Sequence, residues 1–149
     1  MKIIITENQY TLLKEMEDNP KVYNFPSLDV FGNEEPIDNW NLMQSFLDKK
    51  GNPDFSISGN LDLRDTPIES LGNLTSVGGY LNLYGTPIES LGNLTSVGGS
   101  LILSRTPIES LENLTSVGGF LILRNTPISE KYTEKEIRSQ VDVKGKIYL

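Results

Sequence analysis

Apolar residues recur at a fixed spacing through the second half of the chain. The frame L-x-L-x-x-T-P-I-x-S-L-x-N-L-x-x-V-G-G-x begins at Leu61, Leu81, Leu101 and Leu121, so each apolar column returns after twenty residues. A strict period of this length is typical of a solenoid, because one unit has too few apolar residues to close a core alone and must stack on its neighbours. Leu-x-Leu has the two-residue period of a strand with one buried face. The pattern predicts an α/β solenoid with about five parallel strands, at residues 60–64, 80–84, 100–104, 120–124 and 146–149.

The repeated unit resembles a known family. The apolar columns have the spacing of the short leucine-rich repeat of bacterial and phage proteins, and the resemblance covers residues 57–149. That family usually has asparagine at the column that is threonine here, namely Thr66, Thr86, Thr106 and Thr126. A threonine hydroxyl can bond the turning backbone in the same way. The resemblance implies that the parallel strands line a concave face, and that the chain is a non-enzymatic binder of proteins.

Two glycine columns close each unit and differ between the copies. The first column is glycine in the middle units but Ser58 and Lys144 at the two ends. The second column is glycine throughout, at Gly59, Gly79, Gly99, Gly119 and Gly145. We therefore expect only the second column to need a positive φ or a close approach of another backbone.

The end of the array departs from the period and predicts a capping structure. Between Thr126 and Val143 the chain has six more residues than the preceding units. Within this insertion, Thr133 and Glu136 have the spacing of a capping box. We expect a short helix in a C-terminal cap at residues 127–149, with Tyr132, Ile137 and Val141 facing the array.

Residues 1–56 lack the period. About fifty residues seldom hold a stable core alone, so we expect an N-terminal cap to the repeat array of 57–149 rather than an independent domain. K-I-I-I-T predicts a strand, and Glu7–Glu17 predicts a helix. The stretch D-N-P-K-V-Y-N-F-P-S-L-D-V-F-G-N-E-E-P is turn-rich and predicts irregular structure. A second helix is expected from Asp38 as N-cap to Gly51 as C′.

Composition narrows the possible chemistry. The 149 residues include no cysteine and no histidine, and the formal net charge is −7. Disulfides, cysteine nucleophiles, the commonest general base and the commonest neutral metal ligand are therefore excluded. The chain has no glycine-rich phosphate-binding motif, and it has no basic stripe for nucleic acid. We expect no enzymatic activity, no cofactor and no nucleic-acid partner.

The opening M-K-I-I-I-T-E-N-Q-Y bears on location. It has too few consecutive apolar residues for a signal peptide or a membrane span, which predicts a cytoplasmic protein with no membrane partner. The same residues resemble the starts of small phage-encoded proteins. This second resemblance implies a location in the host cytoplasm and a role as an inhibitor of a host defence protein.

Two polar columns of the repeat are expected to be structural. Asn73, Asn93 and Asn113 each stand in N-L-T, formally a glycosylation sequon. Without a secretory signal, we interpret them as asparagines that hold the coil turn. Glu69, Glu89 and Glu109 form a stacked acidic column that must face solvent; a bridging cation is the weaker alternative, and no metal site is predicted.

The candidate binding face follows from what varies between units. The T-P-I-E-S-L turn is nearly invariant, whereas the outward positions of the strands differ in every unit. Aromatic residues and arginine are common anchors at protein interfaces. We predict a partner-binding face formed by Tyr80, Asn82, Tyr84, Ile102, Phe120, Ile122, Arg124 and Tyr148, with Arg64 and Arg105 at its margin.

Other uses of this face remain open. It could be a self-contact, a homo-oligomer interface, or a surface covered by the N-terminal segment. A second class of function is sequestration of a small nucleotide-like ligand, with aromatic stacking and arginine–phosphate contacts. A deep pocket would favour a small ligand, and a shallow open sheet would favour a protein. The third class is a structural, self-assembling protein.

Overall fold

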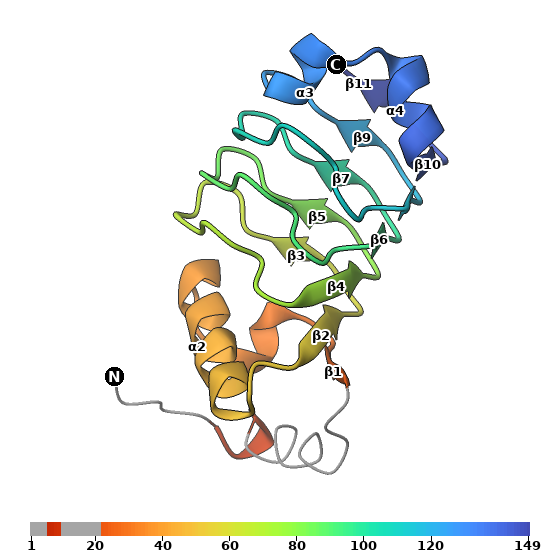
Figure 1. The fold of residues 1–149 in the computed structure, drawn as a ribbon. Helices are drawn as coiled ribbons and strands as arrows, with labels where there is room; N and C mark the ends of the chain where they lie inside the picture. The colour runs from red at the N-terminus through yellow and green to blue at the C-terminus, as the bar shows by residue number, and fades with distance from the viewer. Residues whose placement is uncertain (1–5, 10–21) are drawn as a thin grey trace.

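The computed structural model describes residues 6–9 and 22–149. Within them the chain is an α/β fold with two parallel sheets and few helices, and its coils stack one on another in an arrangement compatible with a solenoid-like repeat (Figure 1). The six-stranded sheet consists of β1 (Val22–Phe25), β2 (Asp54–Ile57), β4 (Leu74–Val77), β6 (Ser96–Val97), β8 (Ser116–Val117) and β10 (Asp142–Val143). The five-stranded sheet consists of β3 (Leu61–Asp62), β5 (Leu81–Asn82), β7 (Leu101–Ile102), β9 (Leu121–Ile122) and β11 (Ile147–Tyr148).

The five strands predicted from Leu-x-Leu are confirmed, although each is only two residues long. Neighbouring strands pair in parallel and in register at the repeat period, as Leu81 does with Leu101. The six-stranded sheet was not predicted. Its strands run through the L-T-S-V segment, where only the flanking Leu74 and Val77 are buried, so the segment lacks the apolar alternation that indicates a strand.

The threonine column acts as the sequence predicts. Each hydroxyl donates to the carbonyl oxygen three residues earlier, from Thr66 to Leu63 at 2.6 Å and from Thr106 to Leu103 at 2.7 Å. Thr86 and Thr126 make the same bond. The hydroxyl therefore satisfies a carbonyl at the point where the chain leaves the strand.

The structure corrects the expectation that only the second glycine column needs a positive φ or a close backbone approach. The second column does lie close to the preceding coil, since a Cβ added at Gly99 would be 2.9 Å from the carbonyl carbon of Gly79. The first column is just as close: a Cβ at Gly98 would overlap the carbonyl oxygen of Gly78. Positive φ occurs in neither column but at the residue before each T-P step, at Asp65, Gly85, Arg105 and Asn125. Ser58 and Lys144 occupy the first column only in the two end coils.

The N-terminal segment is more ordered than the sequence predicts. The stretch expected to be irregular contains β1 and a 3-10 helix, η1 (Leu28–Phe31). The following helix, α2 (Pro36–Lys49), begins earlier than expected, with Glu35 rather than Asp38 as N-cap, because Pro36 suits the first helical position. Gly51 follows the helix at φ 85° and is confirmed as C′. Residues 7–9 are helical, while the predicted K-I-I-I-T strand and the rest of the predicted first helix lie outside the described residues.

The C-terminal insertion forms two short helices. The predicted helix is α4 (Glu134–Gln140), and Thr133 and Glu136 form the capping box in both directions. Ile137 and Val141 are buried and Tyr132 packs against the core, as predicted. The preceding α3 (Pro127–Lys131) was not predicted. Figure 1 shows α2 at one end of the stack and α3 with α4 at the other.

One hydrophobic cluster runs through the described part of the chain from Tyr23 to Val143. It joins the inward leucines and isoleucines of the coils to Trp40, Met43 and Leu47 of α2, so the N-terminal elements and the coils share a core. None of the described helices has both the length and the apolar content that a membrane crossing requires.

Candidate functional site

The outer side of the five-stranded sheet, which we call the five-strand face, carries the predicted binding residues. Leu81 and Leu83 are fully buried on the inner side of β5, so the alternating Tyr80, Asn82 and Tyr84 point outward. Tyr80 is 37% exposed and Phe120 is 47% exposed, which makes them two of the most exposed large apolar side chains among the described residues. These rings lie on one surface, on strands separated by β7.

Phe120, Tyr148 and Arg124 form a cluster across β9 and β11. The rings of Phe120 and Tyr148 meet edge to face, with centroids 5.9 Å apart. The guanidinium carbon of Arg124 lies 5.2 Å from the centroid of the Tyr148 ring. Edge-to-face packing and a cation over a ring each hold the side chains in a defined position. This end of the face therefore brings two aromatic rings and a cationic group together.

A second aromatic and cationic pair lies one coil away. The Arg105 guanidinium carbon is 5.6 Å from the centroid of Tyr84, whose ring is half-buried. Ile102 and Ile122 pair across β7 and β9 and are also half-buried. The structure therefore brings the predicted aromatic and aliphatic residues together on one face.

Two predicted residues are already engaged within the chain. Asn82 is only 9% exposed, and its side-chain oxygen accepts a hydrogen bond from the Tyr84 amide at 3.0 Å. Arg64 is exposed and lies 3.4 Å from the carboxylate of Asp62. Asn82 thus shapes the strand more than it presents a surface, and Arg64 shares its charge with an acidic neighbour.

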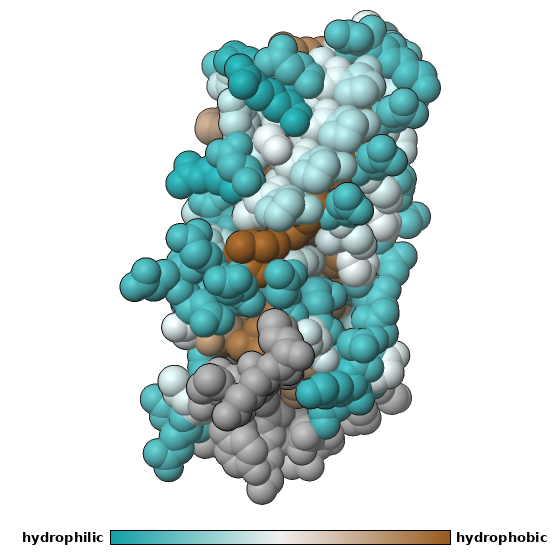
Figure 2. Space-filling view, turned by 90° about the vertical axis from the view of Figure 1, so that its left-hand side faces the viewer, coloured by the Kyte–Doolittle hydropathy of each residue, from teal (hydrophilic) through white to brown (hydrophobic). Residues whose placement is uncertain are grey.

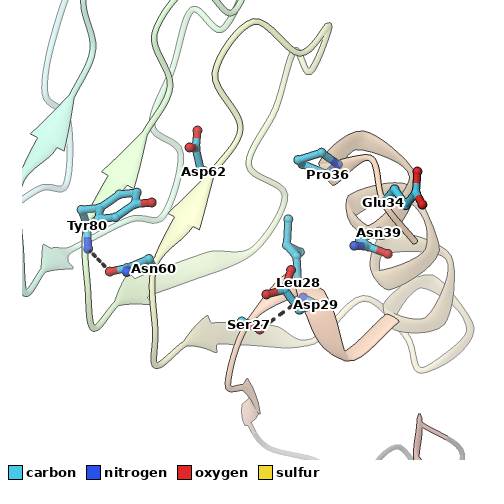
Figure 3. Close-up of a pocket in the computed structure, with 9 residues that line it drawn as sticks. All are labelled: Ser27, Leu28, Asp29, Glu34, Pro36, Asn39, Asn60, Asp62 and Tyr80. Carbon is cyan, nitrogen blue, oxygen red and sulfur yellow. Dashed lines mark hydrogen bonds between the residues drawn. The ribbon is translucent and has the colours of Figure 1, made fainter. Parts of the chain in front are cut away.

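A pocket of about 310 Å³ adjoins the five-strand face at β3. It is lined by Ser27, Leu28, Asp29, Glu34, Pro36, Asn39, Asn60, Asp62 and Tyr80 (Figure 3). The start of η1 forms one wall, the start of α2 another, and the outward side chains of β3 the third. Asn60 is held in place because its side-chain oxygen accepts from the Tyr80 amide at 2.9 Å. None of these described lining residues is basic, and three are carboxylates.

The sequence did not point to this pocket. Asp29 and Glu34 belong to a stretch without periodicity, and nothing in their spacing indicates that they line a pocket together with Asp62. The available signal was the first unit of the array, where both outward residues, Asn60 and Asp62, are polar, whereas each later unit has at least one aromatic or aliphatic residue at these two positions. Their proximity to η1 follows only from the way the chain turns after β1.

The remaining polar columns fit structural roles. The Asn73 side chain donates to the Asn52 carbonyl at 2.6 Å, and Asn113 donates to the Gly92 carbonyl at 3.0 Å, so these asparagines link neighbouring turns. Glu69, Glu89 and Glu109 are exposed, and the described residues contain no group of three or more carboxylates arranged to hold a metal ion. The side of the stack that carries α2 is largely hydrophilic, with a small hydrophobic area (Figure 2).

In comparisons with known proteins, no family model, no curated protein and no solved structure matches this chain.

Proposed function

We propose that the chain is a capped leucine-rich-repeat solenoid that works as a non-enzymatic protein-binding module, with the five-strand face as its binding surface. The observation that carries this proposal is the exposure of Tyr80 and Phe120 on the same face as the Arg105–Tyr84 and Arg124–Tyr148 pairs. Tyrosine and arginine are enriched among the residues that contribute most to binding at protein interfaces.

The invariant and variable columns of the repeat have different roles, and this difference supports the same conclusion. The invariant threonine, asparagine and glycine columns are occupied by internal contacts between or within coils. The residues that vary between coils lie on the outer side of the five-stranded sheet, and most of them reach its surface; Asn82 and Ser104 are buried exceptions. A surface that varies on a constant scaffold is suited to recognition of one particular partner.

A small nucleotide-like ligand is less compatible with the geometry. The pocket beside the face is lined by Asp29, Glu34 and Asp62, and none of Arg64, Arg105 and Arg124 lines it. Phosphate groups would meet like charge there. The five-strand face itself is a sheet surface, which suits a protein better than a ligand that must be largely enclosed.

The partner is a host defence protein in our working hypothesis. This part rests on the opening K-I-I-I-T-E-N-Q-Y and its resemblance to the starts of phage-encoded proteins, together with the absence of a predicted enzymatic site. A module of this kind inhibits by covering a surface of its target.

The test compares capture of host proteins by the immobilised chain and by the double variant Tyr84→Ala/Phe120→Ala. The variant should lose a specifically captured partner, with binding weakened by ~30-fold or more, as expected for loss of interface anchors. Val22→Ala is the matched control, because Val22 is an exposed apolar residue, 51% exposed, that lies outside the five-strand face. The Val22→Ala chain should capture the partner as well as the unmodified chain does.

Two results would contradict the proposal. One is capture of the same partner by the double variant at unchanged affinity, with its folding verified by circular dichroism. The other is self-association that increases with concentration and is abolished by the same two substitutions; that result would favour a self-assembling protein instead.

A further inference from the structure

The two sheets differ by one strand, and the difference has a structural cause. β1 pairs with β2, and the pairing continues through Ser58 and Gly59, whose amides donate to the carbonyls of Phe25 and Pro26, both at 2.9 Å. In the later coils the chain then crosses the glycine corner and forms a strand of the five-stranded sheet. After Pro26 it instead turns into η1, whose first turn is capped by Ser27. No described strand therefore lies beside β3, and the pocket lies there.

The free edge of β3 offers unpaired backbone groups. The amides of Leu61 and Leu63 donate to the carbonyls of Tyr80 and Asn82 on β5, each at 2.9 Å. Backbone groups of successive residues in a strand point to opposite sides, so the amide and carbonyl of Asp62 point away from β5, toward the pocket. Such an edge is a template for pairing with another extended segment.

The charge of the pocket limits what can bind at this edge. Three acidic residues, Asp29, Glu34 and Asp62, come from three separate elements or turns and line one cavity. Asp62 has one described cationic neighbour, Arg64, at 3.4 Å, and the side chain of Arg64 is 63% exposed. Exposed ion pairs are weak, so an incoming cation can compete for Asp62.

We propose that the pocket receives a short, extended and basic segment of a protein partner, which adds to the five-stranded sheet as a strand beside β3. Backbone hydrogen bonds to Asp62 hold the segment, and a lysine or arginine side chain enters the pocket, whose charged lining residues are all acidic. The exposed Tyr80 ring covers the aliphatic part of that side chain. Main-chain pairing supplies affinity and the pocket supplies specificity in this mode of recognition.

The dimensions fit this occupant. A pocket of about 310 Å³ is at the small end of the range for binding sites, which suits one long side chain and the backbone on either side of it. The strands of the five-stranded sheet are themselves only two residues long, so a segment of two or three residues completes the sheet. This proposal rests on the proposed protein-binding function and names the chemistry of the partner at one end of the face.

The test uses blocked seven-residue peptides of alternating sequence as probes, with calorimetry as the measurement. In the first peptide, Lys or Arg alternates with Val or Thr. The second peptide has Glu in place of the basic residues. The third is the basic peptide with N-methylated amides at alternate residues. The basic peptide should bind with one-to-one stoichiometry, and the other two should bind about tenfold more weakly or not at all.

The triple variant Asp29→Asn/Glu34→Gln/Asp62→Asn should weaken binding of the basic peptide about tenfold. Asp62→Asn keeps the hydrogen bond that the side-chain oxygen at this position accepts from the Arg64 amide, because Asn82 accepts the equivalent bond from the Tyr84 amide in the next coil. The matched control is Glu69→Gln/Glu89→Gln/Glu109→Gln, which removes the same number of charges from exposed turns. Binding to this control should be unchanged.

The outcomes separate this proposal from the broader one. Equal binding of the acidic or N-methylated peptide, or equal weakening in the control variant, would overturn strand addition at the pocket. Tyr84→Ala/Phe120→Ala should leave peptide binding unchanged. If the unmodified chain binds no peptide but the double variant still loses the captured partner, only the pocket proposal is wrong. If the unmodified chain binds the basic peptide but the double variant captures the partner normally, only the proposed use of the five-strand face is wrong.

Discussion

Replacing Gly98 by alanine tests whether neighbouring coils depend on backbone contact at the first glycine column. The Gly98 amide donates to the Val77 carbonyl at 2.8 Å, and the Gly99 amide donates to the Gly79 carbonyl at 2.9 Å. An added Cβ would overlap the carbonyl oxygen of Gly78 and lie 3.0 Å from its carbonyl carbon. Because both close atoms belong to the backbone, no side-chain rotation can relieve the overlap.

The expected cost follows from the movement that is needed. Separating the two coils by about 1 Å at this corner stretches both hydrogen bonds beyond a bonding distance. Each bond contributes about 1 kcal/mol, and the looser packing of the adjoining core adds a similar amount. Gly98→Ala should therefore lower the free energy of unfolding by about 3 kcal/mol.

Two substitutions serve as controls. Gly92 has φ 56°, but its added Cβ would meet nothing closer than 3.7 Å, so Gly92→Ala should cost only the ~1 kcal/mol of a left-handed alanine. Ser58 occupies the first glycine column in the first coil and already carries a Cβ. Ser58→Ala should change stability by less than about 0.5 kcal/mol.

Urea unfolding provides the measurement. Far-ultraviolet circular dichroism reports on all the coils, while the fluorescence of Trp40, the one tryptophan and 3% exposed, reports on the N-terminal end. Coinciding transitions with an unchanged slope would allow the free energies to be compared. If Gly98→Ala is no more destabilising than Gly92→Ala, the coils do not depend on backbone contact at the first glycine column.

Two further predictions concern the core and the C-terminal end. Leu94 is fully buried, so Leu94→Ala should destabilise the chain by about 2–5 kcal/mol in the same urea assay, through a cavity between coils; a loss below 1 kcal/mol would contradict this packing. Arg138 donates to the Val143 carbonyl at 2.7 Å and to the Gly145 carbonyl at 2.9 Å, which ties α4 to the last coil. Arg138→Met should lower stability by about 2 kcal/mol and increase amide exchange in residues 141–149, whereas Lys135→Met should do neither.

The candidate site was only partly predictable. The outward residues of the five strands follow from the alternation of Leu-x-Leu, so Tyr80 and Phe120 could be placed on one face from the sequence. Alternation says which way a side chain points but not how much of it stays exposed. Asn82 points outward like Tyr80, yet the amide of Tyr84 and the packed neighbours leave it 9% exposed. The pocket beside β3 required the contact of η1 and α2 with the first coil, which no local pattern describes.

By itself, the sequence determined the repeat period, the five strands, of which four have a buried leucine, the threonine bonds and the capping box at Thr133. These features depend on residues close together in the chain or on a spacing that returns exactly one coil later, so local chemistry and periodicity are sufficient. The tertiary structure alone decided the six-stranded sheet, the backbone contact at the first glycine column, and the open edge of β3. The first two depend on how closely one coil lies against the next, a distance that is set by the packing of the whole stack rather than by any single unit. The third depends on the turn of the chain into η1 after β1.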